Sequence, residues 1–343
     1  MDISTNRLVH ADAAHAASGS IAFVVPVFNE EESVERLVHE IEEYRVAHPS
    51  VEEVIIVDDG SKDATFRLLQ SLVRELRGYR LLRFSRNFGH QLAVTAGLSA
   101  VRSDAAVVLD ADLQDPLTVV DALIEQWRAG HDVVYGIRRS RAGESSLTSR
   151  LRHGYYVFFQ RFTGLDAPLD VGDFRLISRP VIDAFRQFRE QQPYVRGLIA
   201  WLGFSQIGVE YDREGRASGT SKYPYRKLVQ LAGHGITSFT NKPLKYAVRL
   251  GLFTSLLSIL GLVWAVFAKL LQPELVSGWA SLIFVAFFFG GLQLFFLGVV
   301  GSYLGRVYDE VKARPRYVIA ETWSSAGSLL GKQESEQQGR MGV

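Results

Sequence analysis

The sequence predicts an α/β fold with a mainly parallel sheet, followed by two membrane-crossing helices. Short apolar runs alternate with segments whose apolar residues recur at helical spacing, which is typical of a parallel sheet with helices on both faces. Two long stretches near the carboxyl terminus carry no charged residue. Polar and charged clusters directly follow the apolar runs, where open sheets of this kind bind their ligands.

The composition narrows the class of protein before any motif is considered. The 343 residues include 38 basic and 37 acidic residues, and this near-balance argues against a nucleic-acid partner. There is no cysteine, which excludes disulfides and thiolate metal sites, and the eight histidines form no HExxH pair. A metal ion would therefore be held by oxygen ligands. Residues 1–19 are polar and alanine-rich, and we expect a flexible arm there.

Five strands, separated by helices, are expected in the first 136 residues. The first apolar run, IAFVV, meets Pro26, at which we expect the strand to stop. Apolar residues at helical spacing follow between 34 and 41. The same alternation recurs along the chain, and strands are expected at 21–25, 51–57, 79–85, 105–109 and 132–136.

Each expected strand ends in a polar or charged cluster. In chain order the clusters are VPVFNEEE, DDGSKD, RNFGH, DADLQDP and GIRRSR. Each is weak evidence alone, because turns favour Asn, Asp, Gly and Ser in any protein. Together they indicate a binding site, because the carboxyl ends of parallel strands meet at one edge. The sequence has no GxGxxG or GxxxxGK(S/T) element, so a dinucleotide dehydrogenase or P-loop enzyme would lack its phosphate cradle.

The fourth cluster raises an electrostatic question. Asp110, Asp112 and Asp115 lie within six positions directly after an apolar run, and carboxylates this close repel one another unless a cation or suitable donors neutralise them. One interpretation is a solvated turn before the next helix. The other is a divalent cation held by the carboxylates, through which a nucleotide could bind.

Two uncharged stretches predict a transmembrane hairpin. They cover 250–268 and 275–305, and at 1.5 Å per residue each is long enough for a hydrocarbon core of about 30 Å. The basic residues that flank the pair are Lys242, Lys245, Arg249, Arg306, Lys312, Arg314 and Arg316. By the positive-inside rule, we expect a multi-pass protein of the cytoplasmic membrane with both termini in the cytoplasm. A buried soluble helix is the alternative for the first stretch.

Two further segments combine aromatic, apolar and basic residues as interfacial helices do. They cover 222–247 and 151–165, and either could instead pack inside the soluble domain. The expected organisation is thus an arm at 1–19, a cytoplasmic domain at 20–221, an interfacial segment at 222–247, a hairpin at 248–305 and a cytoplasmic tail at 306–343, disordered after about 326.

Several motifs together resemble the family 2 glycosyltransferases of A-type fold. The stretches that carry the resemblance are VPVFNEEESV, IIVDDGSKDAT, RNFGHQLAVTAGL, LDADLQDP, GDFRLISR and ASGTSKYPYRKL. With the membrane hairpin, they are more narrowly similar to polyprenyl-phosphate glycosyltransferases of the bactoprenol glucosyltransferase and dolichol-phosphate mannose synthase type. The resemblance covers about residues 20 to 316. It implies an A-type nucleotide-binding domain with a mainly parallel sheet.

The resemblance implies a site for a nucleotide sugar, with UDP-glucose favoured. The positions matched to nucleotide binding are Pro26, Phe28, Glu30, Val57, Asp59 and Asp110. The positions matched to a Mg²⁺ or Mn²⁺ ion are Asp110, Asp112 and Gln114. A cation there would bridge the aspartates to the diphosphate and offset the charge of the leaving group. The resemblance therefore favours the metal interpretation of the acidic cluster.

The resemblance also implies a lipid acceptor, the phosphate of a polyprenol. Arg138 and Arg175 match phosphate-holding positions, to which the forked guanidinium is suited. Asp173 matches the position of an acceptor-activating base. Because a lipid phosphate has its second pKa near ~6, Asp173 could instead position arginines or substrate. A mobile loop over the phosphates would contain Arg216, Ser221 and Lys222.

The implied reaction is inverting transfer of a hexose, with glucose favoured, to undecaprenyl phosphate for modification of cell-envelope glycans. Mannose from GDP-mannose and other donors stay open, as does a non-catalytic scaffold with a degenerate transferase fold, although the DxD, Asp59, Arg138 and Lys222 are intact. A processive polysaccharide synthase would carry a QxxRW motif, which the sequence lacks. Because two helices are few for shielding a long lipid, a homo-oligomer is compatible with the sequence.

Overall fold

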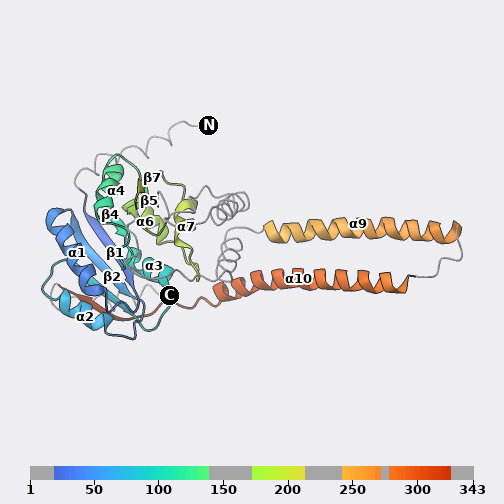
Figure 1. Ribbon diagram of the computed structural model, residues 1–343, viewed down its shortest axis with the longest axis horizontal. Coiled ribbons are helices and arrows are strands. Elements are labelled where there is room, and N and C mark those ends of the chain that lie inside the picture. The colour runs from blue at the N-terminus through green and yellow to red at the C-terminus, as the bar shows by residue number, and fades with distance from the viewer. Residues whose placement is uncertain (1–18, 139–171, 213–241, 272–277, 326–343) are drawn as a thin grey trace. The chain divides into compact units, whose positions relative to one another are not determined.

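The computed structural model describes residues 19–138, 172–212, 242–271 and 278–325 (Figure 1). These residues fall into two compact units. The sheet unit contains the described residues up to 212 and the segment from Pro315. The helical unit contains two long helices that lie before that segment.

The sheet unit has a mainly parallel sheet, as the sequence predicts. Its described strands are β1 (Ile21–Val27), β2 (Val51–Asp58), β3 (Tyr79–Phe84), β4 (Ala105–Val108), β5 (Val133–Arg138), β6 (Arg175–Ser178), β7 (Gln206–Tyr211) and β8 (Ile319–Ser324). They form one sheet in the order β7-β5-β6-β4-β1-β2-β3-β8. Only β6 and β8 among them run antiparallel to their neighbours. The carboxyl ends of the parallel strands therefore share one edge.

Helices cover both faces of this sheet. They are α1 (Val34–Ala47), α2 (Thr65–Leu72), α3 (His90–Ala100), α4 (Thr118–Arg128), α6 (Arg179–Phe185) and α7 (Val195–Trp201). The face with Phe23 and Ile56 packs against α1, α2 and α4 in one apolar core. Successive strand residues point to opposite faces, and Val24 accordingly lies under α3. A Cβ atom on Gly97 of α3 would lie 2.3 Å from Val24 Cγ1, so glycine permits this close approach.

All five expected strands are confirmed, with one correction. Pro26 does not stop β1, because the strand continues to Val27 and pairs Pro26 with Val57 of β2. The fixed φ of proline suits an extended chain, and near a strand end only one ladder donor is missing. The sequence pattern predicted neither β6 and β7 nor the short helices α6 and α7.

A strand from the predicted tail completes the sheet. β8 pairs antiparallel with β3, between Arg80 and Phe84. Just before β8, Tyr317 stacks on Phe84 with ring centroids 5.0 Å apart. Arg316 donates a hydrogen bond to the carbonyl of Phe188 at 3.1 Å. Residues 315–325 thus belong to the sheet unit, and the disorder expected after 326 lies outside the described residues.

The helical unit consists of α9 (Lys242–Leu271) and α10 (Trp279–Val311), which lie side by side (Figure 1). With 30 and 33 residues, they extend about 45 to 50 Å at 1.5 Å per residue. Both contain a window long and apolar enough to cross a membrane, with none of it buried in this structure. The helix α9 begins within the expected interfacial segment, α10 continues past Gly305, and residues 222–241 and 151–165 lie outside the described residues.

Candidate active site

The turns after β1 and β2 interlock at the carboxyl edge of the sheet. The amide of Asn29 donates to Ser61 Oγ at 2.9 Å, and the Asn29 side-chain oxygen accepts from the amide of Lys62 at 2.9 Å. The amide of Glu30 donates to Thr65 Oγ1 at 2.8 Å. Asn29 adopts a φ of 53°, a left-handed conformation that asparagine tolerates. Two of the predicted nucleotide-binding clusters therefore form one surface, on which Phe28 is 40% exposed.

Two of the predicted nucleotide-binding positions lie inside the protein. The side chain of Val57 is fully buried and faces α3, so it contributes packing. The carboxylate of Asp59 accepts hydrogen bonds from the amides of Phe88 at 2.7 Å and Gly89 at 2.9 Å. Burial raises the pKa of Asp59, although both bonds act in the other direction. Asp59 thus holds the turn after β3, and its contact with a nucleotide stays a prediction.

The acidic cluster after β4, residues 110–115, forms a tight turn, the acidic turn. The amide of Leu113, whose φ is 47°, donates to the carbonyl of Asp110, and the amide of Gln114 donates to Asp112 Oδ1, both at 3.2 Å. Asp112 is exposed. Burial, with the nearby charge of Asp173, raises the pKa of Asp110 to about 6. The turn thus presents two carboxylates in different environments.

The residues of this turn fit a divalent cation. Gln114 Oε1 is a buried acceptor without a hydrogen-bond partner among the described residues. Most buried polar atoms in proteins have a hydrogen-bond partner, so an acceptor of this kind favours a bound ligand or water. Two carboxylates and an amide oxygen suit Mg²⁺ or Mn²⁺, which prefer oxygen ligands. Among the described residues no group of three or more His, Cys, Asp or Glu could hold a metal. The protein would therefore supply part of the coordination shell, and phosphate oxygens and water the rest.

Asp173 lies at the centre of a second polar group. His90 Nε2 is 3.0 Å and Gln91 Nε2 is 3.3 Å from its Oδ2, and Arg196 Nε is 3.2 Å from its Oδ1. Burial raises the pKa of Asp173, but the His90 hydrogen bond and the charges of Arg196 and Arg175 outweigh it and hold that pKa below its usual range. Asp173 is therefore ionised at neutral pH and is a weak base.

The two predicted phosphate-binding arginines are both engaged within the protein. Arg175 is 6% exposed and donates to the carbonyl of Gly172 at 2.9 Å. Burial lowers the pKa of Arg175 to about 10, despite the opposing charge of Asp173. Arg138 forms an ion pair with Asp115 at 3.1 Å and donates to the hydroxyl of Tyr211. Contact of either guanidinium with phosphate stays a prediction, and Arg216, Ser221 and Lys222 lie outside the described residues.

The structure adds residues that the sequence interpretation did not select. His90 ends the quoted RNFGH cluster, so its place after a strand could have identified it. Arg196 and Tyr211 come from α7 and β7, for which no element was expected, and no sequence signal placed them near the other clusters.

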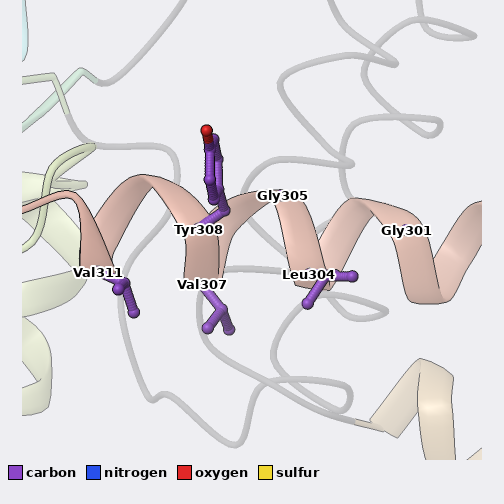
Figure 2. A pocket seen from close by; sticks show the side chains of 6 residues that line it. All are labelled: Gly301, Leu304, Gly305, Val307, Tyr308 and Val311. Atoms are coloured by element: carbon purple, nitrogen blue, oxygen red, sulfur yellow. The ribbon is translucent and has the colours of Figure 1, made fainter.

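A hollow along α10 has a different character. Its volume is about 520 Å³, and its lining consists of Gly301, Leu304, Gly305, Val307, Tyr308 and Val311. Figure 2 shows Leu304, Val307 and Val311 projecting to one side of the helix and Tyr308 to the other. None of these described lining residues is charged, so they supply no charge against a metal ion or a diphosphate.

Comparisons with known proteins identify the family. Residues 22–186 match the family described as Glycosyl transferase family 2. "Uncharacterized glycosyltransferase YkcC" of Bacillus subtilis (strain 168) is 39% identical over 309 residues, which are 90% of this chain and 96% of that protein. "SfII prophage-derived bactoprenol glucosyl transferase" of Shigella flexneri is 38% identical over 302 residues, which are 88% of this chain and 98% of that protein.

One solved structure, glucosyl-3-phosphoglycerate synthase of Mycobacterium tuberculosis in complex with UDP, covers 66% of this chain and 81% of its own with a TM-score of 0.47 and 19% identity. That likeness is too slight to transfer any site residue. The two curated relatives align over nearly their whole length. The chain belongs to glycosyl transferase family 2.

Proposed function

We propose that this chain transfers a hexose from a nucleotide sugar to the phosphate of a membrane polyprenol, with inversion at the anomeric carbon. UDP-glucose is the favoured donor. The structural observation that carries the donor site is Gln114 Oε1, a buried acceptor in the acidic turn for which the described part of the chain supplies no hydrogen-bond partner. The relatives named bactoprenol glucosyl transferase, similar over most of their length, support the glucose donor and the lipid acceptor.

The donor half of the site would be formed by the acidic turn and the turns after β1 and β2. Asp110, Asp112 and Gln114 would hold a Mg²⁺ or Mn²⁺ ion, which supplies positive charge against the departing nucleoside diphosphate. The exposed Phe28 offers an aromatic wall for the base. These groups fix the orientation of the anomeric carbon, and most of the catalysis would be alignment and electrostatic stabilisation.

The acceptor half would be organised by Asp173. A phosphate monoester is largely ionised at neutral pH, since its second pKa is near ~6, so it needs orientation more than deprotonation. Asp173, with its lowered pKa, cannot take up a proton readily but can hold His90 and Arg196 in place. We therefore assign Asp173 to positioning rather than to general base catalysis. The phosphate oxygen attacks the anomeric carbon, and the nucleoside diphosphate leaves.

The helical unit would keep the enzyme in the same bilayer as its substrate. The polyprenyl chain can stay in lipid while its phosphate reacts if the enzyme is held at the membrane, and α9 and α10 have the length and composition to hold it there. The basic residues at both ends of the hairpin support cytoplasmic termini in the inner membrane. A homo-oligomer remains part of the proposal, as additional helices would shield the long lipid.

Transfer of labelled sugar tests the proposal. Detergent-purified protein is mixed with short-chain polyprenyl phosphate and, in parallel, UDP-glucose, UDP-galactose, UDP-N-acetylglucosamine or GDP-mannose. We expect lipid-linked label from UDP-glucose that EDTA abolishes and that Mg²⁺ or Mn²⁺ restores. Label from another donor would contradict the glucose assignment. Absence of both sugar transfer and metal-dependent nucleotide retention would support a non-catalytic scaffold and contradict the proposed transferase activity.

A further inference from the structure

Three side chains from separate segments meet beside the acidic turn. Asp115 ends that turn, Arg138 ends β5 and Tyr211 ends β7. The Tyr211 hydroxyl donates to Asp115 Oδ1 at 2.6 Å, and Arg138 Nη2 lies 3.1 Å from Asp115 Oδ2. Arg138 Nε donates to the Tyr211 hydroxyl oxygen at 3.1 Å, which closes the triangle. The side chain of Asp115 is 3% exposed and that of Arg138 is 14% exposed.

Two glycines make room for this triangle. A Cβ atom on Gly136 would lie 2.6 Å from the Tyr211 ring, and one on Gly172 would lie 3.0 Å from Arg138 Nη2. The Tyr211 ring also packs edge-on against Phe174, with centroids 5.7 Å apart. The hydroxyl of Tyr211 and the guanidinium of Arg138 are thus held at fixed positions on the sheet.

The triangle ties the acidic turn to strands with which β4 does not pair. In the sheet, β6 lies between β4 and β5, and β7 lies beyond β5. Asp115 is directly bonded in sequence to Gln114 and is three residues from Asp112. Holding the Asp115 carboxylate therefore restricts the positions that the turn can adopt. Arg138 also neutralises Asp115, so that the mutual repulsion within the acidic turn comes from two carboxylates instead of three.

We propose that Asp115 and Tyr211, with Arg138, are positioning residues that fix the acidic turn for binding of a divalent cation with a nucleoside diphosphate. The inference deepens the proposed function and rests on it. It assigns Arg138 to holding Asp115 in place, whereas the resemblance matched it to phosphate. Restricting the turn before the ligands arrive lowers the ordering cost of binding them.

The variant Asp115→Asn separates the two roles of Arg138. The probe is Mn²⁺ with UDP, and binding to the purified full-length chain is followed by electron paramagnetic resonance of free Mn²⁺. If Arg138 positions the turn, the substitution weakens Mn²⁺ binding in the presence of UDP by about tenfold or more. If Arg138 binds the diphosphate directly, release from Asp115 leaves binding unchanged or tightens it. That second result would overturn the proposal.

A pair of tyrosine variants distinguishes a specific effect on Mn²⁺ binding from a general loss of stability. Tyr211→Phe removes one hydroxyl and keeps the ring packing. Tyr79→Phe is the matched control, because Tyr79 is also buried and its hydroxyl donates to a carboxylate, Glu42 Oε2, at 2.9 Å, but it begins β3 at the opposite edge of the sheet. We expect similar decreases in melting temperature in both variants and weaker Mn²⁺ binding only in Tyr211→Phe.

Equal Mn²⁺ affinities in wild type and Tyr211→Phe would contradict the positioning role of Asp115, Tyr211 and Arg138. Equal weakening of Mn²⁺ binding in Tyr79→Phe would contradict it as well. These outcomes are distinct from failure of the proposed function. If the wild type binds Mn²⁺ and UDP but transfers no sugar to lipid, the proposed reaction is wrong and the positioning role is unaffected. If the wild type binds no Mn²⁺ in the presence of UDP, both the proposed donor site and the positioning role are wrong.

Discussion

The sheet unit and the helical unit use the same kinds of apolar side chain in opposite ways. In the sheet unit, Phe23 and Ile55 are fully buried. In the helical unit, Trp264 is 73% exposed and Phe287 is 78% exposed. Apolar composition therefore does not distinguish a protein core from a surface that faces lipid. The length of the uninterrupted apolar run does, since runs of four to eight residues suit buried strands and runs of about twenty suit a membrane helix.

The two units also differ in where their charges lie. The apolar windows of α9 and α10 contain few charged residues, and basic residues flank the hairpin. The sheet unit instead concentrates acidic groups at its carboxyl edge, where burial and the charge of Asp173 raise the pKa of Asp110. Burial of apolar groups stabilises the sheet unit, whereas its edge provides the chemistry. In the helical unit, the apolar side chains named above are exposed among the described residues, as is compatible with a membrane-associated segment.

The largest expected effect comes from removing a core side chain. Phe23→Ala should lower the free energy of unfolding by about 3 to 5 kcal/mol, because it leaves a cavity between β1 and the helices on that face. Urea unfolding of the full chain in detergent, followed by tryptophan fluorescence, measures the change. The matched control is Phe287→Ala in α10, which should change the same quantity by no more than about 0.5 kcal/mol. A comparable loss of unfolding free energy in Phe287→Ala would mean that α10 packs against protein, which would contradict the contrast between buried and exposed apolar side chains in the two units.

The next effect concerns the acidic edge. Asp112→Asn should reduce sugar transfer by about 10²- to 10³-fold, because one of the charges that would hold the metal is lost. Its side chain is exposed, so the melting temperature should stay close to that of the wild type. Transfer assays at several Mn²⁺ concentrations, with melting curves of the same preparations, test both parts. Wild-type transfer in this variant would remove Asp112 from the metal site.

The strand pattern predicted much of the sheet but not its ends. The first five strands were predictable because each contains clustered apolar residues and is followed by a polar or charged cluster. β6 has only four residues and begins with the charged Arg175, so it carries little signal. β8 reads IAETWS and lies beyond two long apolar helices, so nothing local indicates that it pairs with β3. Its place depends on an open sheet edge, which is a tertiary property.

The candidate site was predictable to a similar extent. The rule that ligands bind at the carboxyl ends of parallel strands selected the turn with Asp110 and Asp112. It could not show that Asp115 is already bonded to Tyr211, because that contact follows from the strand order β7-β5-β6-β4. Nor could it show that Arg175 is buried beside Asp173. The sequence thus predicted where the polar clusters lie, whereas tertiary packing determines which of their charged groups interact with each other.

The smallest expected effect tests the charge of His90. Burial lowers the pKa of His90, but the hydrogen bond and the charge of Asp173 raise it by more. Because the folded-state pKa is raised, protonated His90 stabilises the fold fully below its unfolded pKa of about 6.5, and this contribution is lost as the pH rises through the folded-state value. Asp173, whose pKa is lowered, stays ionised well below pH 5, so the pair is intact at pH 5.5.

The variant His90→Gln keeps a hydrogen-bond donor and removes the charge. The difference in melting temperature between wild type and variant should be larger at pH 5.5 than at pH 8.5. The His90 side chain is 43% exposed, so solvent screening limits the effect to about 0.2 to 1 kcal/mol. Equal differences at both pH values would mean that His90 holds Asp173 by hydrogen bonding alone, and the electrostatic contrast between this edge and the uncharged helices would not extend to His90.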